Sequence, residues 1–301
     1  MKGRGVSHIA LIIVNIIYGI NYTVAKEVMP HYMQPFGFIL LRVVAATLLF
    51  YTAHYFFVKQ KIERKDIARL ILCGVFGVAL NQLMFFKGLN LTTPINASIM
   101  MISTPILVLV MSVVIIREKL SAIKITGVAL GAIGAYLIIS QGKTASFGTS
   151  TSLGDFLVFI NATSYAIYLV LVKPLMAKYH PLTVVKWSFL FGSIMVIPFG
   201  YTEFARTNWA AIPLEIWLCI AYVVFLTTFL AYMLNLFAMK KVNPSVVGVY
   251  IYSQPVISTL VALSFQKDTL SLGKIIAALL IFAGVYLVSF HGRRVQLVKN
   301  T

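Results

Sequence analysis

Residues 117–127 read REKLSAIKITG, and residues 267–277 read KDTLSLGKIIA. Both stretches hold an acid, a Leu-Ser pair and a lysine at the same spacing, and they lie 150 residues apart. The same offset relates Pro94 to Pro244, Pro105 to Pro255, and Gly134-x-Tyr136 to Gly284-x-Tyr286. A register kept without a gap from Pro94 to Tyr136 indicates that the second half of the chain repeats the first.

The composition places both halves in a membrane. Hydrophobic residues make up 60% of the 301 residues and charged residues only 11%, less than half the share usual in soluble domains. Apolar runs of about 20 residues are long enough to cross the hydrocarbon core as helices. Ten such runs are present: 7–28, 36–58, 66–88, 93–116, 123–141, 153–173, 181–200, 213–239, 243–265 and 272–291. The expected fold is therefore an all-α integral membrane protein with ten transmembrane helices.

The net charge of +17 is distributed in a way that indicates topology. Eighteen of the 25 lysines and arginines fall on the side of the N-terminus when the chain is threaded through these spans. Six fall on the opposite side, and Arg42 lies within a span. Because cytoplasmic loops carry the excess of Lys and Arg, we expect both termini in the cytoplasm and the protein in the inner (cell) membrane. The basic residues follow the loops, so a nucleic-acid partner is not expected.

Each repeat contains an odd number of spans, so the second repeat enters the membrane from the opposite side. The two repeats are therefore inverted: Glu118 falls in an inner loop and its counterpart Asp268 in an outer one. The longest connection is a Gly/Ser/Thr-rich stretch between spans five and six. We divide the chain into a first five-helix repeat (1–142), a linker (143–152) and a second, inverted five-helix repeat (153–301).

The order of these motifs resembles the drug/metabolite transporter superfamily, in its ten-helix EamA-type branch. The resemblance covers nearly the whole chain. It rests on the run Tyr18-Gly19-Ile20-Asn21-Tyr22-x3-Lys26, on Arg42, on the block Pro94–Ser98, and on Arg117-Glu118-Lys119-Leu120-Ser121 leading into Gly127. The family usually has Gly-Glu where this chain has Arg117-Glu118, and more often Trp at Tyr18. The resemblance implies an inner-membrane carrier, commonly an exporter of small metabolites.

Polar side chains in mid-span mark either a cavity or a helix contact, because each is costly in hydrocarbon without a partner. Helical spacing gathers them on one face of spans one, three, six, eight and nine. We expect the solute-binding residues to be Asn15, Tyr18, Tyr22, Asn81, Gln82, Phe85, Met101, Asn161, Tyr165, Tyr168, Tyr232, Asn235, Tyr250 and Gln254. Hydrogen bonding between helices is the alternative for any one of them.

Two prolines interrupt the fourth and ninth spans. Pro105 and Pro255 lack a backbone donor, which frees the carbonyl four residues earlier, at Met101 and Ile251. One interpretation is a hinge, or a carbonyl that lines the site, on a helix that moves during alternating access. The other is a static kink that improves packing.

Three cations are expected at an outer vestibule. Arg42 lies about six residues inside the outer end of span two, from where its side chain can snorkel to the headgroups or attract a carboxylate at the mouth. Lys26 and Lys87 lie at outer span ends, as interfacial anchors or as part of the same vestibule.

Close helix packing is expected along span five. Its Gly127-x3-Gly131-x2-Gly134 spacing lets a neighbouring helix of the same repeat approach, and a homodimer through this face is the alternative.

These features favour a secondary transporter that moves a small organic metabolite by alternating access, with an amino-acid-like solute as one candidate. A nucleotide-sugar or phosphate-ester carrier should show a mid-depth Lys or Arg facing the cavity, and none stands out in the sequence. A non-transporting membrane subunit is a further alternative. No enzyme, cofactor or metal site is expected, because the spans hold no nucleophile–base pair and no metal-ligand cluster. The partners expected are the solute and the lipid bilayer.

The energy source is expected to be the solute gradient itself. All eight Asp and Glu residues fall in loops or at span ends, and the five histidines lie at or near span ends. Proton relays in transporters usually need an Asp, Glu or His within the membrane. We therefore expect facilitated diffusion or exchange of a neutral or zwitterionic solute.

Single cysteines introduced at Ser150 and at Arg64 test the topology, in a variant that lacks Cys73 and Cys219. A membrane-impermeant thiol reagent applied to intact cells should label position 150 and not position 64, because the linker is expected outside. Permeabilised cells, in which both positions should react, provide the control. Labelling at position 64 alone would overturn the orientation.

Overall fold

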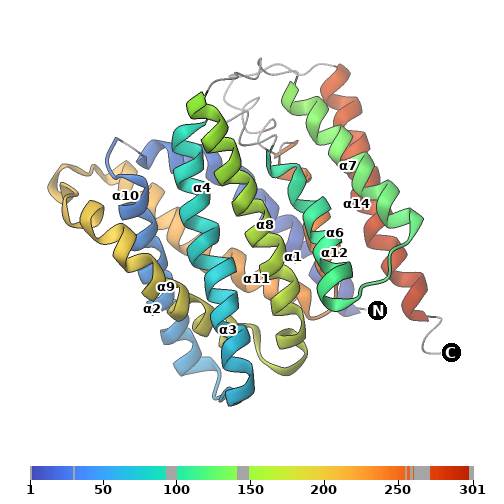
Figure 1. The fold of residues 1–301 in the computed structure, drawn as a ribbon, viewed down its shortest axis with the longest axis horizontal. Helices are drawn as coiled ribbons and strands as arrows, with labels where there is room; N and C mark the ends of the chain where they lie inside the picture. Colours follow the sequence, from blue (N-terminus) through green and yellow to red (C-terminus); the bar gives the residue numbers. More distant parts are fainter. Residues whose placement is uncertain are drawn as a thin grey trace.

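A computed structural model of the protein describes residues 2–29, 31–92, 100–140, 149–254, 256–257, 260 and 272–297. All regular structure within these ranges is helical, and Figure 1 shows the helices gathered side by side in one bundle. The expected all-α fold is confirmed.

The described residues of the first half form five helical segments. Its first two are α1 (Lys2–Val28) and α2 (Pro35–Phe57). The third runs through the 3₁₀ turn η1 (Arg64–Asp66), α3 (Ile67–Gly74), the π-helical η2 (Val75–Ala79) and α4 (Leu80–Leu91). The last two are α6 (Ser103–Ile116), which the helical residues Met100 and Met101 precede, and α7 (Ala122–Ser140).

The second half has the same order of segments. Its first two are α8 (Thr149–Lys178) and α9 (Pro181–Ala205), followed by the 3₁₀ turn η3 (Trp209–Ala211). The third runs through α10 (Leu214–Ala221), the π-helical η4 (Tyr222–Leu230) and α11 (Ala231–Met239). The last two are α12 (Pro244–Tyr250) and α14 (Leu272–Leu297). Because α8 begins at Thr149, residues 149–152 of the predicted linker are helical, and α9 extends five residues beyond its predicted end at residue 200.

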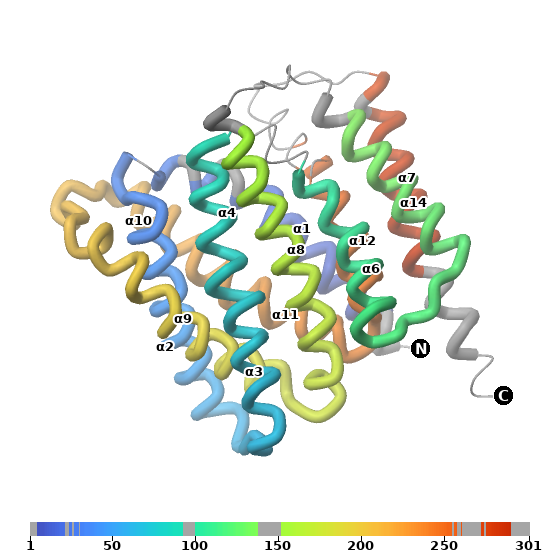
Figure 2. Tube along the Cα trace, in the orientation of Figure 1, coloured from blue at the N-terminus to red at the C-terminus, as the bar shows by residue number. Residues whose placement is uncertain are grey.

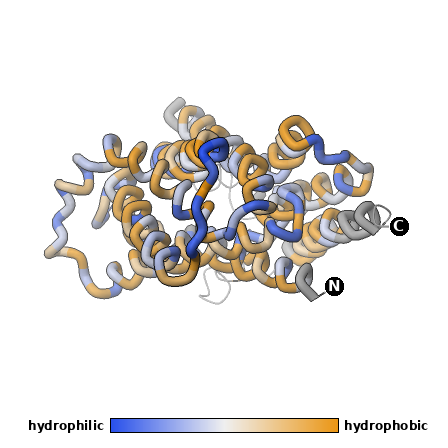
Figure 3. Tube along the Cα trace, turned by 90° about the horizontal axis from the view of Figure 1, so that it is seen from below, coloured by the Kyte–Doolittle hydropathy of each residue, from blue (hydrophilic) through white to orange (hydrophobic). Residues whose placement is uncertain are grey.

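The surface of the bundle suits a bilayer. Within the described part of the chain, five helices are long and apolar enough to cross a membrane: Pro35–Phe57, Arg64–Leu91, Ser152–Lys178, Pro181–Ala205 and Leu214–Met239. Shorter apolar helices lie at Gly5–Asn21, Ser103–Ile116, Ala122–Leu137 and Ile275–Ser289. Seen from below in Figure 3, hydrophilic stretches cross the end of the bundle, whereas the helices are mostly hydrophobic. The protein is a multi-pass membrane protein.

The main contacts between helices follow the repeat. When each helix is replaced by its equivalent in the other half, one contact becomes another of these contacts or stays the same. α7 packs along α14, and α2 packs along α9, so each of these pairs joins equivalent spans. α4 packs on α8 while α11 packs on α1, so the third span of each half contacts the first span of the other. Equivalent helices α6 and α12 also contact each other. The views in Figures 1 and 2 show α7 and α14 side by side at one edge of the bundle. This pattern is the one that two related repeats predict.

Glycines allow the close approach of α7 to its neighbours. A Cβ added to Gly127 would lie 2.8 Å from the carbonyl oxygen of Gly284, and one added to Gly134 would lie 2.6 Å from that of Ala277. Gly131 lies against the ring of Tyr252. The glycine face of α7 therefore packs against helices of the second repeat. The expected packing against a helix of the same repeat is wrong, because α14 of the other half occupies this face. The homodimer, which was the alternative, stays a prediction.

The α6 helix ends in a strained conformation at Arg117. This residue has a φ of 52° and is the only residue other than glycine with a positive φ in the described ranges. The Glu118 N–H donates to the Ser112 carbonyl at 3.0 Å, which closes the helix end. The left-handed conformation costs a residue with a Cβ roughly 1–2 kcal/mol, and glycine adopts it readily. In the family that the sequence resembles, this position is usually glycine, and the left-handed conformation explains that preference.

Replacing Arg117 by glycine should therefore stabilise the protein. We expect Arg117→Gly to raise the free energy of unfolding by about 1 kcal/mol, measured by thermal unfolding of the purified protein in detergent. Arg206 is the matched control, because it also follows a helix end, α9, but has a φ of −87°. Arg206→Gly should leave the stability unchanged or lower it. A loss of stability in Arg117→Gly would contradict the claim that the backbone at Arg117 is strained.

Candidate functional site

A cavity of about 120 Å³ lies between the two halves of the bundle. It exceeds the ~10–15 Å³ that one water needs and is smaller than the roughly 300 Å³ of pockets that hold drug-sized ligands. Its size therefore suits a small metabolite. It is lined by Val14, Asn15, Tyr18, Asn21, Arg42, Asn81, Gln82, Phe85, Phe86, Met101, Asn161, Tyr165, Thr227, Tyr232, Asn235, Val247, Ile251 and Gln254.

Most of the residues singled out in the sequence meet at this cavity. Those that line it are Asn15, Tyr18, Asn81, Gln82, Phe85, Met101, Asn161, Tyr165, Tyr232, Asn235 and Gln254. The side chain of Tyr22 lies outside the described residues. Helical faces from both halves thus converge on one cavity. We propose that these residues bind the solute.

Tyr168 and Tyr250 do not line the cavity, contrary to the prediction. Tyr168 is buried with its ring against Gly77, whose missing side chain leaves space for it. The Tyr250 hydroxyl lies 2.9 Å from Nδ1 of His8, so this side chain turns to α1. Residues four apart, such as Tyr250 and Gln254, share one face only in a continuous helix. The helix is interrupted directly after Tyr250, so the two side chains do not share a face.

Pairs of equivalent residues face each other across the cavity. The offset of 150 residues relates Gln82 to Tyr232, and the Gln82 Nε2 lies 3.5 Å from the Tyr232 hydroxyl oxygen. The same offset relates Met101 to Ile251, and both residues line the cavity. Residues of both repeats therefore meet at the centre of the site.

Amide side chains tie the walls of the cavity together. Asn161 Nδ2 donates to the Asn81 carbonyl at 2.7 Å, and Asn81 Nδ2 lies 3.4 Å from the Asn161 carbonyl, which joins α8 to α4. Gln254 Nε2 donates to Asn15 Oδ1 at 2.9 Å, and Asn15 Nδ2 donates to the Leu11 carbonyl at 2.7 Å. The polar residues are thus both contacts between helices and lining of the cavity.

Two π-helical segments at equivalent positions shape the site, and the sequence did not predict them. A π-helix leaves backbone carbonyls free for side chains, and such segments are frequent at functional sites. In η2 the Gly77 carbonyl accepts a hydrogen bond from Tyr232 at 2.9 Å. In η4 the Val223 carbonyl accepts one from the Thr228 hydroxyl at 2.7 Å. The residues that follow η2 and those within η4 reach the cavity.

The fourth and ninth spans are interrupted at matching places. The turns fall at Ile102 and at Ile251–Tyr252. At both, a serine hydroxyl bonds to the carbonyl three residues earlier at 2.6 Å: Ser103 to Met100, and Ser253 to Tyr250. The Ile251 carbonyl that the sequence predicted to be free accepts the Gln254 N–H at 3.0 Å.

The prolines expected as hinges lie close to these turns. Pro105 is buried in the first turn of α6, just after the interruption and not in the middle of a continuous helix. Pro255 lies outside the described residues.

Arg42 lies inside the bundle and not at an outer vestibule. It is the eighth residue of α2, about 10 Å along the axis from the start of the helix. Its side chain is 6% exposed, its Nε donates to Thr228 Oγ1 at 2.7 Å, and its Cζ lies 5.9 Å from the centre of the Phe86 ring. Snorkelling is therefore wrong for Arg42, because Thr228 on η4 holds it at the cavity.

The other two predicted vestibule cations differ from Arg42. Lys87 is exposed near the ring of Phe36 and does not line the cavity. The side chain of Lys26 lies outside the described residues.

Several lining residues were missed as binding residues. Val14 and Phe86 are apolar, and an apolar residue in a membrane span carries no signal of its own. Asn21 and Thr227 are polar and bond to each other at 3.1 Å, so their mid-span positions could have identified them. No group of three or more His, Cys, Asp or Glu that could hold a metal occurs in the described part of the chain.

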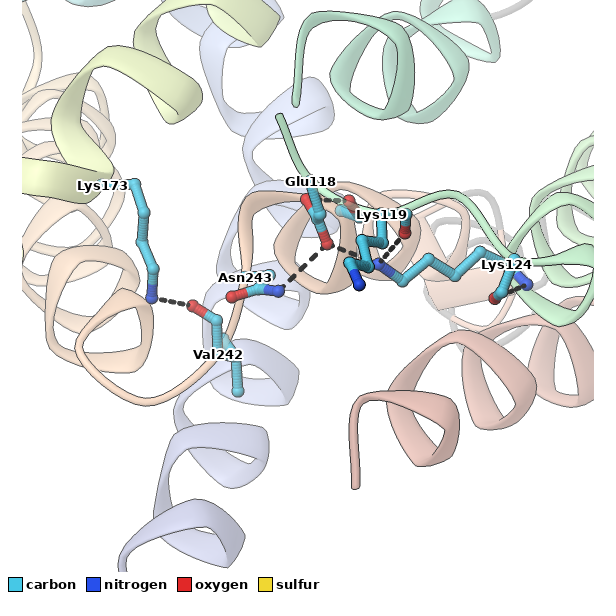
Figure 4. A network of polar contacts seen from close by, with 8 residues as sticks. Glu118, Lys119, Lys124, Lys173, Val242 and Asn243 are labelled. Atoms are coloured by element: carbon cyan, nitrogen blue, oxygen red, sulfur yellow. Dashed lines mark hydrogen bonds and ion pairs between the residues drawn. The ribbon is translucent and has the colours of Figure 1, made fainter. Parts of the chain in front are cut away.

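Glu118 joins the two halves at one end of the bundle, which the charge pattern predicts to be cytoplasmic. Its carboxylate accepts hydrogen bonds from Lys124 Nζ at 2.7 Å, Asn243 Nδ2 at 3.1 Å and Ser245 Oγ at 2.6 Å (Figure 4). The side chains of Glu118 and Lys124 are only 6% and 9% exposed. The connection between α6 and α7 is therefore tied to the start of α12.

Lys173 holds the same region from another side. Its Nζ, at the end of a side chain from α8, donates to the Met239 carbonyl at 2.5 Å. It also donates to the Val242 carbonyl at 2.6 Å (Figure 4). A cation at the last carbonyls of α11 also interacts favourably with the helix dipole. The α11–α12 connection is thus held by contacts from both halves of the chain.

A solute-sized cavity enclosed by two related halves of a membrane bundle is the architecture of a membrane transporter. Comparison with known proteins agrees and identifies the family. The EamA-like transporter family matches this chain twice, at residues 6–140 and 152–290. The chain belongs to the EamA-like transporter family, which is a family of transporters and not of enzymes.

Relatives in distant organisms cover nearly the same length. The uncharacterized transporter YyaM of Bacillus subtilis is 25% identical over 94% of this chain and 93% of its own. An uncharacterized transporter of Archaeoglobus fulgidus is 26% identical over 90% of this chain and 94% of its own. A WAT1-related protein of Arabidopsis thaliana is 26% identical over 89% of this chain and 75% of its own. A solved crystal structure with 18% identity superposes with a TM-score of 0.79, over 96% of this chain and 98% of that chain, and this likeness shows the fold.

The buried ion pair of Glu118 should matter more for stability than an exposed one. We expect Glu118→Gln to lower the free energy of unfolding by about 3–5 kcal/mol, because it leaves Lys124 buried without a counter-charge. Glu63 is the control: it pairs with Lys65 at 2.7 Å and Lys178 at 3.0 Å, and its side chain is 51% exposed. Those hydrogen bonds hold the pKa of the Glu63 carboxyl below its usual value.

The measurement is thermal or denaturant unfolding of each variant in detergent. Glu63→Gln should change the stability little, since exposed pairs contribute little. The double variant Glu118→Leu with Lys124→Met should be more stable than Glu118→Gln, because it leaves no buried charge. Equal losses in Glu118→Gln and Glu63→Gln would contradict the role assigned to this pair.

Proposed function

We propose that this protein is a secondary transporter that exports a small organic metabolite across the inner membrane by alternating access. The observation that carries this proposal is the cavity between the two halves, lined from both repeats at the level of the matching helix interruptions. A solute held there touches both repeats at once. A change in how the repeats pack then moves access from one end of the bundle to the other.

The interruptions support movement of the fourth and ninth spans. Near Ile102 and Tyr252 the serine-to-carbonyl bonds replace regular helix hydrogen bonds. A helix segment that ends at such a turn can tilt without breaking the backbone hydrogen bonds of its neighbour. Because α6 and α12 contact each other, a tilt of one requires an adjustment of the other.

The cavity favours a small solute that is partly polar and partly apolar, and amino-acid-like compounds are the class we propose. The nucleotide-sugar or phosphate-ester carrier gains one supporting observation, since Arg42 supplies a cation at the cavity. The volume of about 120 Å³ is small for a nucleotide sugar, because pockets for ligands of that size usually exceed roughly 300 Å³. A non-transporting subunit would bind without moving the solute.

The proposed energy source is the solute gradient or exchange with a second solute. No acidic or histidine side chain is among the described residues that line the cavity. Glu118, the most buried carboxylate of the described ion pairs, already accepts three hydrogen bonds at the end of the bundle. Export as the direction rests on the family resemblance.

The test is counterflow in proteoliposomes that contain the purified protein and a radiolabelled mixture of the twenty common amino acids. Asn81→Ala, Tyr165→Ala, Asn235→Ala and Gln254→Ala should each lower the initial rate about tenfold while the folded yield stays within about twofold. Hydrogen bonds between membrane helices average below 1 kcal/mol, so the fold should survive their loss. Asn208→Ala and Tyr201→Ala are the matched controls, because both residues are exposed and outside the cavity.

Two outcomes would count against the proposal. Unchanged rates in all four cavity variants would place the transport path elsewhere. With an imposed pH gradient, uphill accumulation that collapses with a protonophore would rule out a purely solute-driven mechanism. In that case Asp155, whose carboxylate accepts a hydrogen bond from Thr92 at 2.5 Å, is the first residue to replace.

A further inference from the structure

Arg42 is a buried cation at the cavity that no acid among the described residues neutralises. The four ion pairs of the described chain involve Lys65, Lys124 and Lys178, and none involves Arg42. A charged side chain inside a membrane protein normally pairs with an opposite charge, because the uncompensated charge is costly there. A single hydrogen bond to Thr228 and one aromatic face at 5.9 Å do not replace a counter-ion.

The guanidinium group is held in a way that leaves donors free. The Thr228 hydroxyl donates its own proton to the Val223 carbonyl, so its oxygen accepts from Nε of Arg42. Of the five N–H donors of an arginine, the four on the two Nη atoms have no hydrogen-bond partner among the described residues. This pair of nitrogens is the group that binds a carboxylate with two parallel hydrogen bonds.

The fold itself does not require a cation at this position. The equivalent helices α2 and α9 both begin with a proline, Pro35 and Pro181, and the eighth residue is Arg42 in one and Ser188 in the other. Ser188 is buried and lies outside the cavity. The two repeats therefore share the backbone and differ in this charge, which indicates a role in binding for Arg42.

The cavity also offers hydrogen-bond acceptors without donors. The side-chain oxygens of Gln82 and Asn161 are buried and have no partner among the described residues, although both side chains line the cavity. Their orientations follow from their nitrogens: Asn161 Nδ2 donates to the Asn81 carbonyl, and Gln82 Nε2 faces the Tyr232 hydroxyl. Because Tyr232 donates its own proton to Gly77, its oxygen is the acceptor in that contact.

We propose that the solute carries both a carboxylate and a hydrogen-bond donor such as an ammonium group, with the carboxylate on Arg42 and the donor at the oxygens of Gln82 and Asn161. The apolar side chains of Phe85, Met101 and Ile251 then contact the body of the solute. This inference rests on the proposed function and adds which residues hold the carboxylate and the donor group of the solute. A zwitterion satisfies the cation and the two amide oxygens with one carboxylate and one ammonium group, whereas a phosphate ester without hydroxyl or amino groups satisfies only Arg42.

The first test needs no knowledge of the solute. Arg42→Gln should unfold at the same temperature as the unmodified protein or at a higher one when no solute is present, because it removes an uncompensated buried charge. A purely structural arginine predicts the opposite, a marked loss of stability. Arg206→Gln is the matched control, because Arg206 is exposed after α9 and should show no change.

The second test measures thermal stabilisation of the purified protein by defined pools. These are the twenty common amino acids, the corresponding amino-acid amides, the corresponding 2-keto acids, and sugar phosphates. A ligand that binds only the folded state raises the unfolding temperature. We expect the amino acids to stabilise most, the keto acids less, and the amides and sugar phosphates least. For the most stabilising amino acid, Arg42→Gln should weaken binding roughly 30-fold or more, and Arg42→Lys should weaken it less.

Gln82→Leu tests binding of the donor group separately from binding of the carboxylate. It should weaken binding of the amino acids and leave the keto acids, which lack the ammonium group, nearly unaffected. Stabilisation by amides or sugar phosphates alone, or by no carboxylate pool, would overturn the assignment. Flux in proteoliposomes that does not depend on Arg42 would overturn this inference and leave the proposed function intact. Arg42-dependent binding without flux would support this inference and overturn the proposed function.

Discussion

Every backbone N–H and carbonyl group within a bilayer needs a partner inside the protein, and this requirement organises the structure. Regular helices meet it along most of the chain. Where the helices are irregular, side chains replace the missing bonds: Ser103 and Ser253 at the two turns, and Tyr232 and Thr228 at the two π-helical segments. These irregular places lie around one cavity. The cavity exists because the helices are regular elsewhere and deviate together here.

The duplication makes these deviations occur in pairs, and the exceptions to the pairing are informative. Gln82 and Tyr232 occupy equivalent positions and contact each other, so the centre of the site follows the repeat. Arg42 has no charged equivalent, because Ser188 stands in its place. A site with a cation on one repeat alone has a defined direction across the cavity. In the proposed mechanism, the shared backbone arrangement permits movement between two states, while the unequal side chains provide selectivity.

The sequence predicted the helices and most of the cavity lining, because both depend on local patterns. Hydropathy and the 150-residue offset identify the spans, and the 3.6-residue period places Asn81 and Tyr165 on inward faces. Tyr250 was placed wrongly because the interruption after it changes the period. Arg42 was placed at the outer surface because snorkelling depends on depth alone, whereas its true partner Thr228 lies 186 residues away. The π-helical segments have no pattern of residues from which they could be predicted.

The groups proposed to bind the solute also lower the stability of the fold. A guanidinium group without a counter-ion and two amide oxygens without a donor, as the described residues leave them, are unfavourable in a water-poor interior, and an apolar lining would remove that penalty. Short hydrogen bonds nevertheless hold the side chains of Arg42 and Asn161 in position. Sites of this kind retain local instability in return for function. A bound solute that completes these contacts stabilises whichever arrangement of the two repeats encloses it most fully. In the proposed mechanism, the groups that select the solute therefore also favour closure around it, which is the step that alternating access requires.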